Sequence, residues 1–138
     1  MREIWKMFQY TIAGVGAWLG WFLGEFDGLI YALVAFITID YITGVMRAFI
    51  EKNLSSEVGA RGIFKKVFIF ILVGIGHIID AYVLSGGSAI RTAVIFFYLS
   101  NEGVSILENA VVIGLPIPDK LRAVLEQLRS SGDKNESK

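Results

Sequence analysis

The sequence predicts an all-α fold, a polytopic membrane helical bundle of four transmembrane helices followed by a C-terminal amphipathic helix. The chain of 138 residues is 54% hydrophobic and only 19% charged, whereas soluble domains carry about 25% charged residues. Its apolar residues gather into four long stretches, and its basic residues lie between and beyond them. A soluble helical bundle is the alternative, but four such stretches leave too little polar sequence to cover them.

The first stretch, residues 7–24, contains no charged side chain over 18 positions. This length approaches the roughly 20 residues that cross a hydrocarbon core as a helix, and it predicts a helix over residues 5–24. A cleaved signal peptide is the alternative, because Arg2 and Lys6 precede the stretch. Large aromatic residues such as Trp21 occupy the end at which small residues mark a cleavage site, which favours a retained helix.

The second and third stretches are interrupted by few polar residues and predict helices over residues 28–50 and 62–84. The fourth predicts a helix over residues 91–114, although it is apolar at both ends and polar in its middle. An arrangement with three spans, in which the fourth segment lies at the membrane interface, therefore remains open.

The pattern changes after residue 117, where Leu121, Val124, Leu125 and Leu128 follow the i, i+3, i+4, i+7 spacing of one helical face. This spacing predicts a short amphipathic helix over residues 118–129. We expect a transmembrane helical domain over residues 1–115, and a cytoplasmic amphipathic helix with a disordered tail over residues 116–138.

The basic residues predict the orientation. Twelve of the 13 fall on one side of a four-span arrangement, and only Arg91 falls on the other. Cytoplasmic segments carry the excess of Lys and Arg, so both termini are expected in the cytoplasm of a bacterial cell, with the chain crossing the cytoplasmic membrane several times. The 13 acidic residues balance the 13 basic ones, so no overall positive field favours nucleic acid as a partner.

Met7 is a candidate second translation start. Initiation there would remove Arg2, Glu3 and Lys6 and keep the first apolar stretch intact. The two forms would then differ in the positive charge that restrains insertion of the N-terminal segment. A chance methionine is the alternative.

The residues that enzymes need are missing from the sequence. There is no cysteine, only one histidine, and no Gly-rich loop between a strand and a helix. The chain therefore lacks the residues needed for thiol chemistry, for a Cys-based metal site and for nucleotide binding. We expect no catalytic residue, no cofactor, no bound metal and no enzymatic activity.

Polar residues inside the apolar stretches are the candidate functional residues. Ionisable groups are costly in a bilayer and persist where they face protein, water or each other. The candidates are Asp40, His77 and Asp80 in the second and third stretches, and Asn101, Glu102, Ser105, Glu108 and Asn109 in the fourth. Each of them could instead be a permanent polar contact between helices.

Small residues indicate close helix packing. Gly16, Gly20 and Gly24 recur every four residues and share one helical face, and Gly44 lies in the second stretch. Glycines at this spacing let helix backbones approach closely in lipid. The pattern is compatible with packing inside one chain and with self-association of several chains.

Several segments resemble one family in the expected order. They are IDYITG at residues 39–44, NLSSEVGARGIFKK at 53–66, HIID at 77–80, SNEGVSILEN at 100–109 and LPIPDKL at 115–121. Through these motifs the chain resembles small phage-encoded holins of the clostridial toxin-secretion and phage-lysis type, over roughly residues 36–128.

The resemblance implies a membrane protein that accumulates, forms homo-oligomers and opens lesions in the cytoplasmic membrane at a programmed time. Such lesions release a cell-wall-degrading endolysin, or a toxin without a signal peptide. Two other classes remain open from the residues alone. A small ion or proton channel or transporter subunit would use the same acidic residues, and a membrane adaptor would use the amphipathic tail to hold a cytoplasmic partner.

The fourth stretch places its polar residues on one side. A helix advances about 100° per residue, which brings Asn101, Glu102, Ser105, Glu108 and Asn109 within an arc of about 120°. Such a stripe cannot face lipid cheaply. We expect it to point inward in a monomer, toward Asp40, Asp80 or His77, and to line the lesion in an oligomer. A permanent polar seam inside the bundle is the alternative.

Overall fold

The computed structural model describes residues 1–124 and 126–127, which form helices and their connections without any strand. The helices are α1 (Arg2–Leu23), α2 (Gly28–Ile50), α3 (Ser56–Ile78), the π-helical turn η1 (Ile79–Val83) that continues α3, and α4 (Ala89–Ile113). The predicted all-α fold is confirmed.

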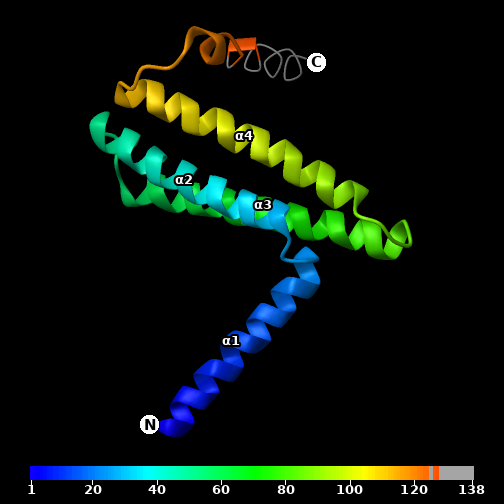
Figure 1. Cartoon of the computed structure of the whole chain (residues 1–138). Helices are drawn as coiled ribbons and strands as arrows, with labels where there is room; N and C mark the ends of the chain where they lie inside the picture. Colours follow the sequence, from blue (N-terminus) through cyan, green and yellow to red (C-terminus); the bar gives the residue numbers. More distant parts are fainter. Residues whose placement is uncertain (125, 128–138) are drawn as a thin grey trace.

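Three of the helices form a bundle. Helices α2 and α4 run antiparallel to α3, and α4 packs on both of them (Figure 1). Helix α1 leaves this bundle at a wide angle, so that its N-terminal end lies far from the other helices (Figure 1). Only the last turns of α1 pack on α3, and residues 1–18 are exposed.

Local sequence signals fix the ends of the bundle helices. Asp27 precedes α2 and accepts a hydrogen bond from the backbone N–H of Ile30, at 3.1 Å. Ser55 does the same for α3 through Val58, also at 3.1 Å. Short polar side chains at these positions satisfy backbone N–H groups that have no partner within the helix. Gly114 ends α4 in the left-handed conformation, which glycine adopts without steric cost.

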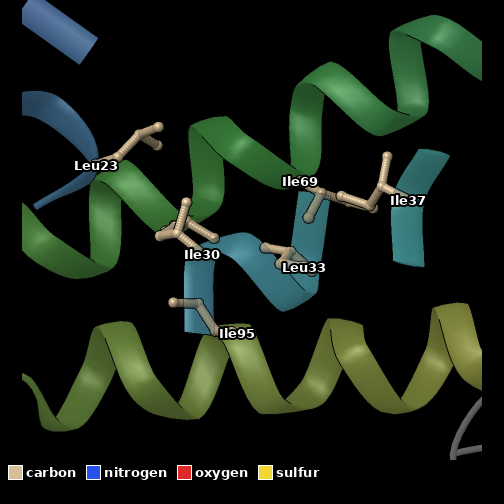
Figure 2. Packing of buried hydrophobic residues seen from close by; sticks show 7 residues of the cluster. Leu23, Ile30, Leu33, Ile37, Ile69 and Ile95 are labelled. Atoms are coloured by element: carbon tan, nitrogen blue, oxygen red, sulfur yellow. The ribbon is translucent and has the colours of Figure 1, made fainter. Parts of the chain in front are cut away.

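An apolar layer fills the middle of the bundle. All three bundle helices contribute side chains to this layer, which consists of Ile30, Leu33, Ile37, Ile69, Val73 and Ile95. Leu23, from the end of α1, lies beside them (Figure 2). Leu33, Val73 and Ile95 are completely buried, at 0% exposure. Their packing holds the three helices together by excluding solvent and by dispersion contacts.

The outer surface of the bundle is also apolar. Two helical segments are long and apolar enough to cross a membrane, α2 with a mean hydropathy of 1.9 and Ser56–Val83 with 2.0. In each segment, only 22% of the apolar 18-residue stretch is buried inside the protein. The core helix of a soluble protein, by contrast, is mostly buried. Exposed Phe36, Phe68 and Ile71 illustrate a surface suited to lipid. Helices α1 and α4 are long enough but more polar, so four spans stay a prediction.

Most predicted helix ends differ from the observed ones by three residues or fewer, including the beginning of α1 at Arg2 instead of residue 5, whereas the beginning of α3 differs more. Helix α3 begins six residues before the predicted position 62, because the Ser55 cap starts a helical turn within what the sequence suggested was a loop. The connection between α2 and α3 is therefore only residues 51–55. Helix α1 ends at Leu23, since Gly24 has a φ of +86°.

The predicted amphipathic helix lies partly inside the described residues. Positions 119–124 and 126–127 are helical, in agreement with the spacing of the apolar side chains. Residue 125 and the end of the predicted segment, 128–129, lie outside the described residues, as does the expected tail.

Candidate functional site

Charged side chains from three helices meet inside the bundle. The ammonium group of Lys66 on α3 donates to the carboxylate of Asp40 on α2 and to Glu102 Oε2 on α4, the latter at 2.5 Å. Asp40 and Glu102 are each only 6% exposed. A single lysine therefore links α2, α3 and α4.

Asn109 extends this group toward the end of α4. Its Nδ2 donates to Asp40 Oδ1 at 3.1 Å and to Thr43 Oγ1 at 3.0 Å. We call Asp40, Lys66, Glu102 and Asn109 the Lys66 cluster. Among the described residues, no buried side-chain nitrogen or oxygen lacks a hydrogen-bond partner. A fully satisfied polar network fixes the mutual rotation and register of the helices that contribute to it.

The Lys66 cluster contains two carboxyl groups for one ammonium group. Because Lys66 contacts both carboxyl groups, complete ionisation would give the cluster a net charge of −1. Charge inside a bilayer is tolerated where it is paired or where it faces water. Because the Lys66 cluster holds more carboxyl groups than ammonium groups, access of water to it matters for its stability in a membrane.

A second polar group lies at the opposite end of the bundle, around Arg91. This side chain is 3% exposed, and its guanidinium donates to the backbone oxygens of Leu23 and Glu25, both at 2.6 Å. It also donates to Asp27, Nη1 to Oδ2, at 2.9 Å. Arg91 thereby ties the connection between α1 and α2 to the beginning of α4.

Asp80 caps α4 from a different helix. Its carboxylate, 0% exposed, accepts hydrogen bonds from the backbone N–H groups of Ile90 at 3.0 Å and Arg91 at 2.8 Å. Backbone N–H groups at a helix N-terminus favour negative charge. The position of Asp80 in the π-helical turn η1 brings it to this point. We call Asp27, Asp80 and Arg91 the Arg91 cluster.

The Arg91 ion pair also affects the titration of its partner. The hydrogen bond from the Arg91 guanidinium holds the pKa of Asp27 below its usual value of 3.8. The Asp27 carboxyl group therefore stays ionised at neutral pH, where it pairs with Arg91.

The apolar layer separates the two clusters along every helix of the bundle. In α2 it lies between Asp27 and Asp40, in α3 it follows Lys66, and in α4 it lies between Arg91 and Glu102. Among the residues that the structure describes, the buried polar side chains thus fall into two separate clusters.

The comparison with known proteins identifies the family. The model of the bacteriophage holin family matches residues 17–130, which is most of the chain. The chain belongs to the bacteriophage holin family. Holins are not enzymes, so the expectation that the protein has no enzymatic activity is confirmed.

Curated relatives of this holin-family chain cover nearly its whole length. It is 37% identical over 130 residues to an uncharacterized 14.9 kDa protein of Clostridium perfringens, covering 94% of this chain and 98% of the relative. It is 46% identical over 126 residues to an uncharacterized protein of Listeria innocua, covering 91% and 89%. It is 34% identical over 100 residues to a probable holin of Bacillus phage phi105, covering 72% and 73%. No solved structure matches the chain.

Four of the eight predicted polar residues of this holin-family chain lie in the two clusters. Asp40, Glu102 and Asn109 lie in the Lys66 cluster, and Asp80 lies in the Arg91 cluster. His77 lies beside Gly24, near Arg91. The polar stripe of the fourth stretch is divided, because Glu102 and Asn109 are buried, Ser105 and Glu108 are half-buried, and Asn101 is exposed.

The predicted packing glycines have different surroundings. A Cβ atom added at Gly16 would meet nothing within 4 Å, and one at Gly20 would lie 3.4 Å from the ring of Phe26. Gly24 lies beyond the end of α1, so it does not continue their helical face. Gly44 faces α4, where a Cβ would lie 3.8 Å from Asn109 Nδ2.

Sequence reasoning missed Lys66 and Arg91 as site residues, because it used them only to predict the orientation of the chain in the membrane. Helical spacing could have found both. Lys66 lies three residues before Ile69 and seven before Val73, on the face that carries the apolar layer. Arg91 lies four residues before Ile95 in the same way. Within the part of the chain that the structure describes, no group of three His, Cys, Asp or Glu side chains comes together to hold a metal ion.

Proposed function

We propose that this chain is a holin that assembles with copies of itself in the bacterial cytoplasmic membrane and opens lesions there. These lesions would let a cell-wall-degrading endolysin, or a toxin without a signal peptide, leave the cell in timed lysis. The observation that carries the proposal is the polarity of the bundle, which pairs its charges inside and presents apolar side chains outside. Such a protein is suited to lipid, and its family is that of the holins.

We further propose four membrane spans with both termini in the cytoplasm. The distribution of basic residues supports this orientation. Residues 1–115 would then form the transmembrane domain, and residues 116–138 would lie on the cytoplasmic side. Helix α1 would cross the membrane beside the bundle, with its exposed aromatic side chains available to lipid or to a neighbouring subunit.

The Lys66 cluster gives the proposal a physical mechanism. In the closed bundle, Glu102 and Asn109 are held by Lys66 and Asp40. When several subunits meet, the polar face of α4 would turn toward water in the lesion, and hydration would replace these contacts. Because that exchange needs neighbouring subunits to enclose water, opening would be cooperative.

A selective ion or proton channel is the second candidate. The acidic residues of the bundle favour it, because such groups form ion paths in membrane proteins. The apolar layer argues against conduction through a single closed subunit, since it separates the two clusters.

Induced expression in a bacterium separates these functions. Membrane potential and viability are followed over time, with and without a co-expressed endolysin that lacks an export signal. A holin is expected to abolish the membrane potential abruptly and to permit lysis only when the endolysin is present. Selective conductance without cell death would instead identify a channel, and unchanged permeability would identify an adaptor.

A further inference from the structure

A cavity of about 220 Å³ lies between α2 and α3, close to their connection. It is lined by the exposed side chains of Leu54 and Val58 and by the buried side chains of Asp40 and Asn109, and we call its buried side the floor. Its remaining lining includes Lys66 and Ser105. The volume is sufficient for several water molecules, and the polar floor offers them hydrogen-bond partners.

Small residues keep this cavity open. Gly44 on α2 and Gly59 and Gly62 on α3 line it. Across the cavity, the Tyr41 hydroxyl on α2 donates to the backbone oxygen of Gly59 at 3.4 Å. A Cβ added at Gly62 would lie 3.3 Å from the Tyr41 ring, so larger side chains on α3 would narrow the space between the helices.

We propose that the cavity is an aqueous vestibule, which brings water from the side of the α2–α3 connection to the Lys66 cluster in the closed protein. The reason is that the cluster holds two carboxyl groups and one ammonium group. Its net negative charge, when both carboxyl groups are ionised, is stabilised inside a membrane by water. The side to which the vestibule opens rests on the proposed function, because the orientation proposed there makes the vestibule open to the cytoplasm.

The vestibule ends at the apolar layer. Asp40 lies thirteen positions after Asp27, which corresponds to about 20 Å of helix at 1.5 Å per residue. The hydrocarbon core is about 30 Å thick, so with Asp27 at one interface the Lys66 cluster lies well inside the membrane. Water and small cations would therefore reach Asp40 from one side, while Leu33, Val73 and Ile95 keep the membrane sealed.

The absence of cysteine from the sequence permits a direct test. Single variants Gly44→Cys and Ser105→Cys place a thiol at the floor of the vestibule, and Leu33→Cys places one in the apolar layer. Phe68→Cys provides a matched control, because this position is exposed in the structure but faces lipid in the proposed membrane arrangement. Each variant is expressed as the full chain in membranes and treated with a charged, membrane-impermeant methanethiosulfonate, applied to inverted or to right-side-out vesicles.

The two floor variants are expected to react about tenfold or more faster than Leu33→Cys and Phe68→Cys, because the reactive thiolate forms only where water reaches it. Ser105→Cys exchanges one oxygen for sulfur, and a Cβ at Gly44 makes only an ordinary contact, so both variants should fold. Labelling of the floor variants as slow as that of Leu33→Cys would overturn the vestibule. So would equally fast labelling of all four variants. Fast labelling of the floor variants from right-side-out vesicles alone would keep the vestibule and contradict the proposed orientation.

Discussion

Lys66 on α3 and Glu102 on α4 lie 2.5 Å apart, Nζ to Oε2, and the same ammonium group contacts Asp40 on α2. These three residues are separated by 26 and 36 positions along the chain. The helices of the bundle are thus joined by a charge cluster in addition to the apolar layer.

Replacing Lys66 by methionine should destabilise the bundle strongly. The change leaves two buried carboxyl groups without their cation, and breaking a buried ion pair costs about 3 kcal/mol or more. Thermal unfolding in detergent measures the effect. Lys65→Met is the matched control, because this neighbouring lysine is exposed. Equal losses in the two variants would contradict the role assigned to Lys66.

Substitutions on α4 should change lysis timing. Glu102→Gln weakens the contact with Lys66 in the closed bundle. Glu102→Asp shortens the side chain by one methylene and draws the carboxylate away from Lys66, and Glu108→Gln alters the same polar face. We expect altered or abolished lysis while the protein still accumulates in the membrane, measured by culture turbidity and immunoblotting. Glu57→Gln, at an exposed surface ion pair, is expected to lyse on the normal schedule. Normal timing in the α4 variants would show that this face does not form the lesion.

Acid should weaken the Arg91 cluster. The pKa of Asp27 lies below 3.8 in the folded protein because of its hydrogen bond with Arg91. The pair therefore contributes its full stability above pH 3.8, and the contribution is lost as the pH falls through the folded pKa. The midpoint of thermal unfolding in detergent should fall in that range. Asp27→Asn should lower the midpoint at neutral pH and flatten the decrease in acid; an identical profile would refute this assignment.

Gly74→Ala should displace the end of α1 from α3. A Cβ at position 74 would overlap the ring of Phe22, which stacks on Trp18 with ring centroids 5.5 Å apart. We expect faster proteolysis of the α1–α2 connection in detergent. The double variant Gly74→Ala/Phe22→Ala should recover part of the protection because the overlap is removed. Gly14→Ala is the control, since a Cβ there meets nothing within 4 Å; equal effects at both glycines would contradict the prediction.

The proposed orientation predicts where a C-terminal reporter becomes active. A fusion after residue 138 to a reporter that folds only outside the cytoplasm should be inactive, because four spans return the chain to the cytoplasmic side. A reporter that requires the cytoplasm should be active at the same position. The reverse result would indicate three spans.

The sequence was sufficient to predict the bounds of those helices whose ends depend on residues within one helical turn. The predicted range 28–50 coincides with α2, and the range 91–114 differs from α4 by two residues at its start and one at its end. Asp27 and Gly114 act on backbone groups within one helical turn. The beginning of α3 was wrong because the Ser55 cap was overlooked among the charged residues that surround it.

The polar residues could be found from the sequence, but their partners could not. An acidic residue in an apolar stretch is conspicuous, so Asp40, Asp80 and Glu102 were predicted as candidates. Lys66 lies at the edge of a charged segment. Helical spacing places it on the face of Ile69 and Val73, but its contacts with Asp40 and Glu102 follow only from the rotation of α3 against α2 and α4.

The sequence by itself determined that this chain is helical, suited to a membrane and similar to holins, since composition and helical periodicity are properties of short segments. Only the tertiary structure decided that the polar groups form two separate clusters with an apolar layer between them. Contacts such as that of Arg91 with Asp27, 64 positions apart, depend on the axial register and rotation of packed helices. The physical reason is that register and rotation are set by the sum of side-chain contacts over the whole interface, which no single stretch of sequence contains.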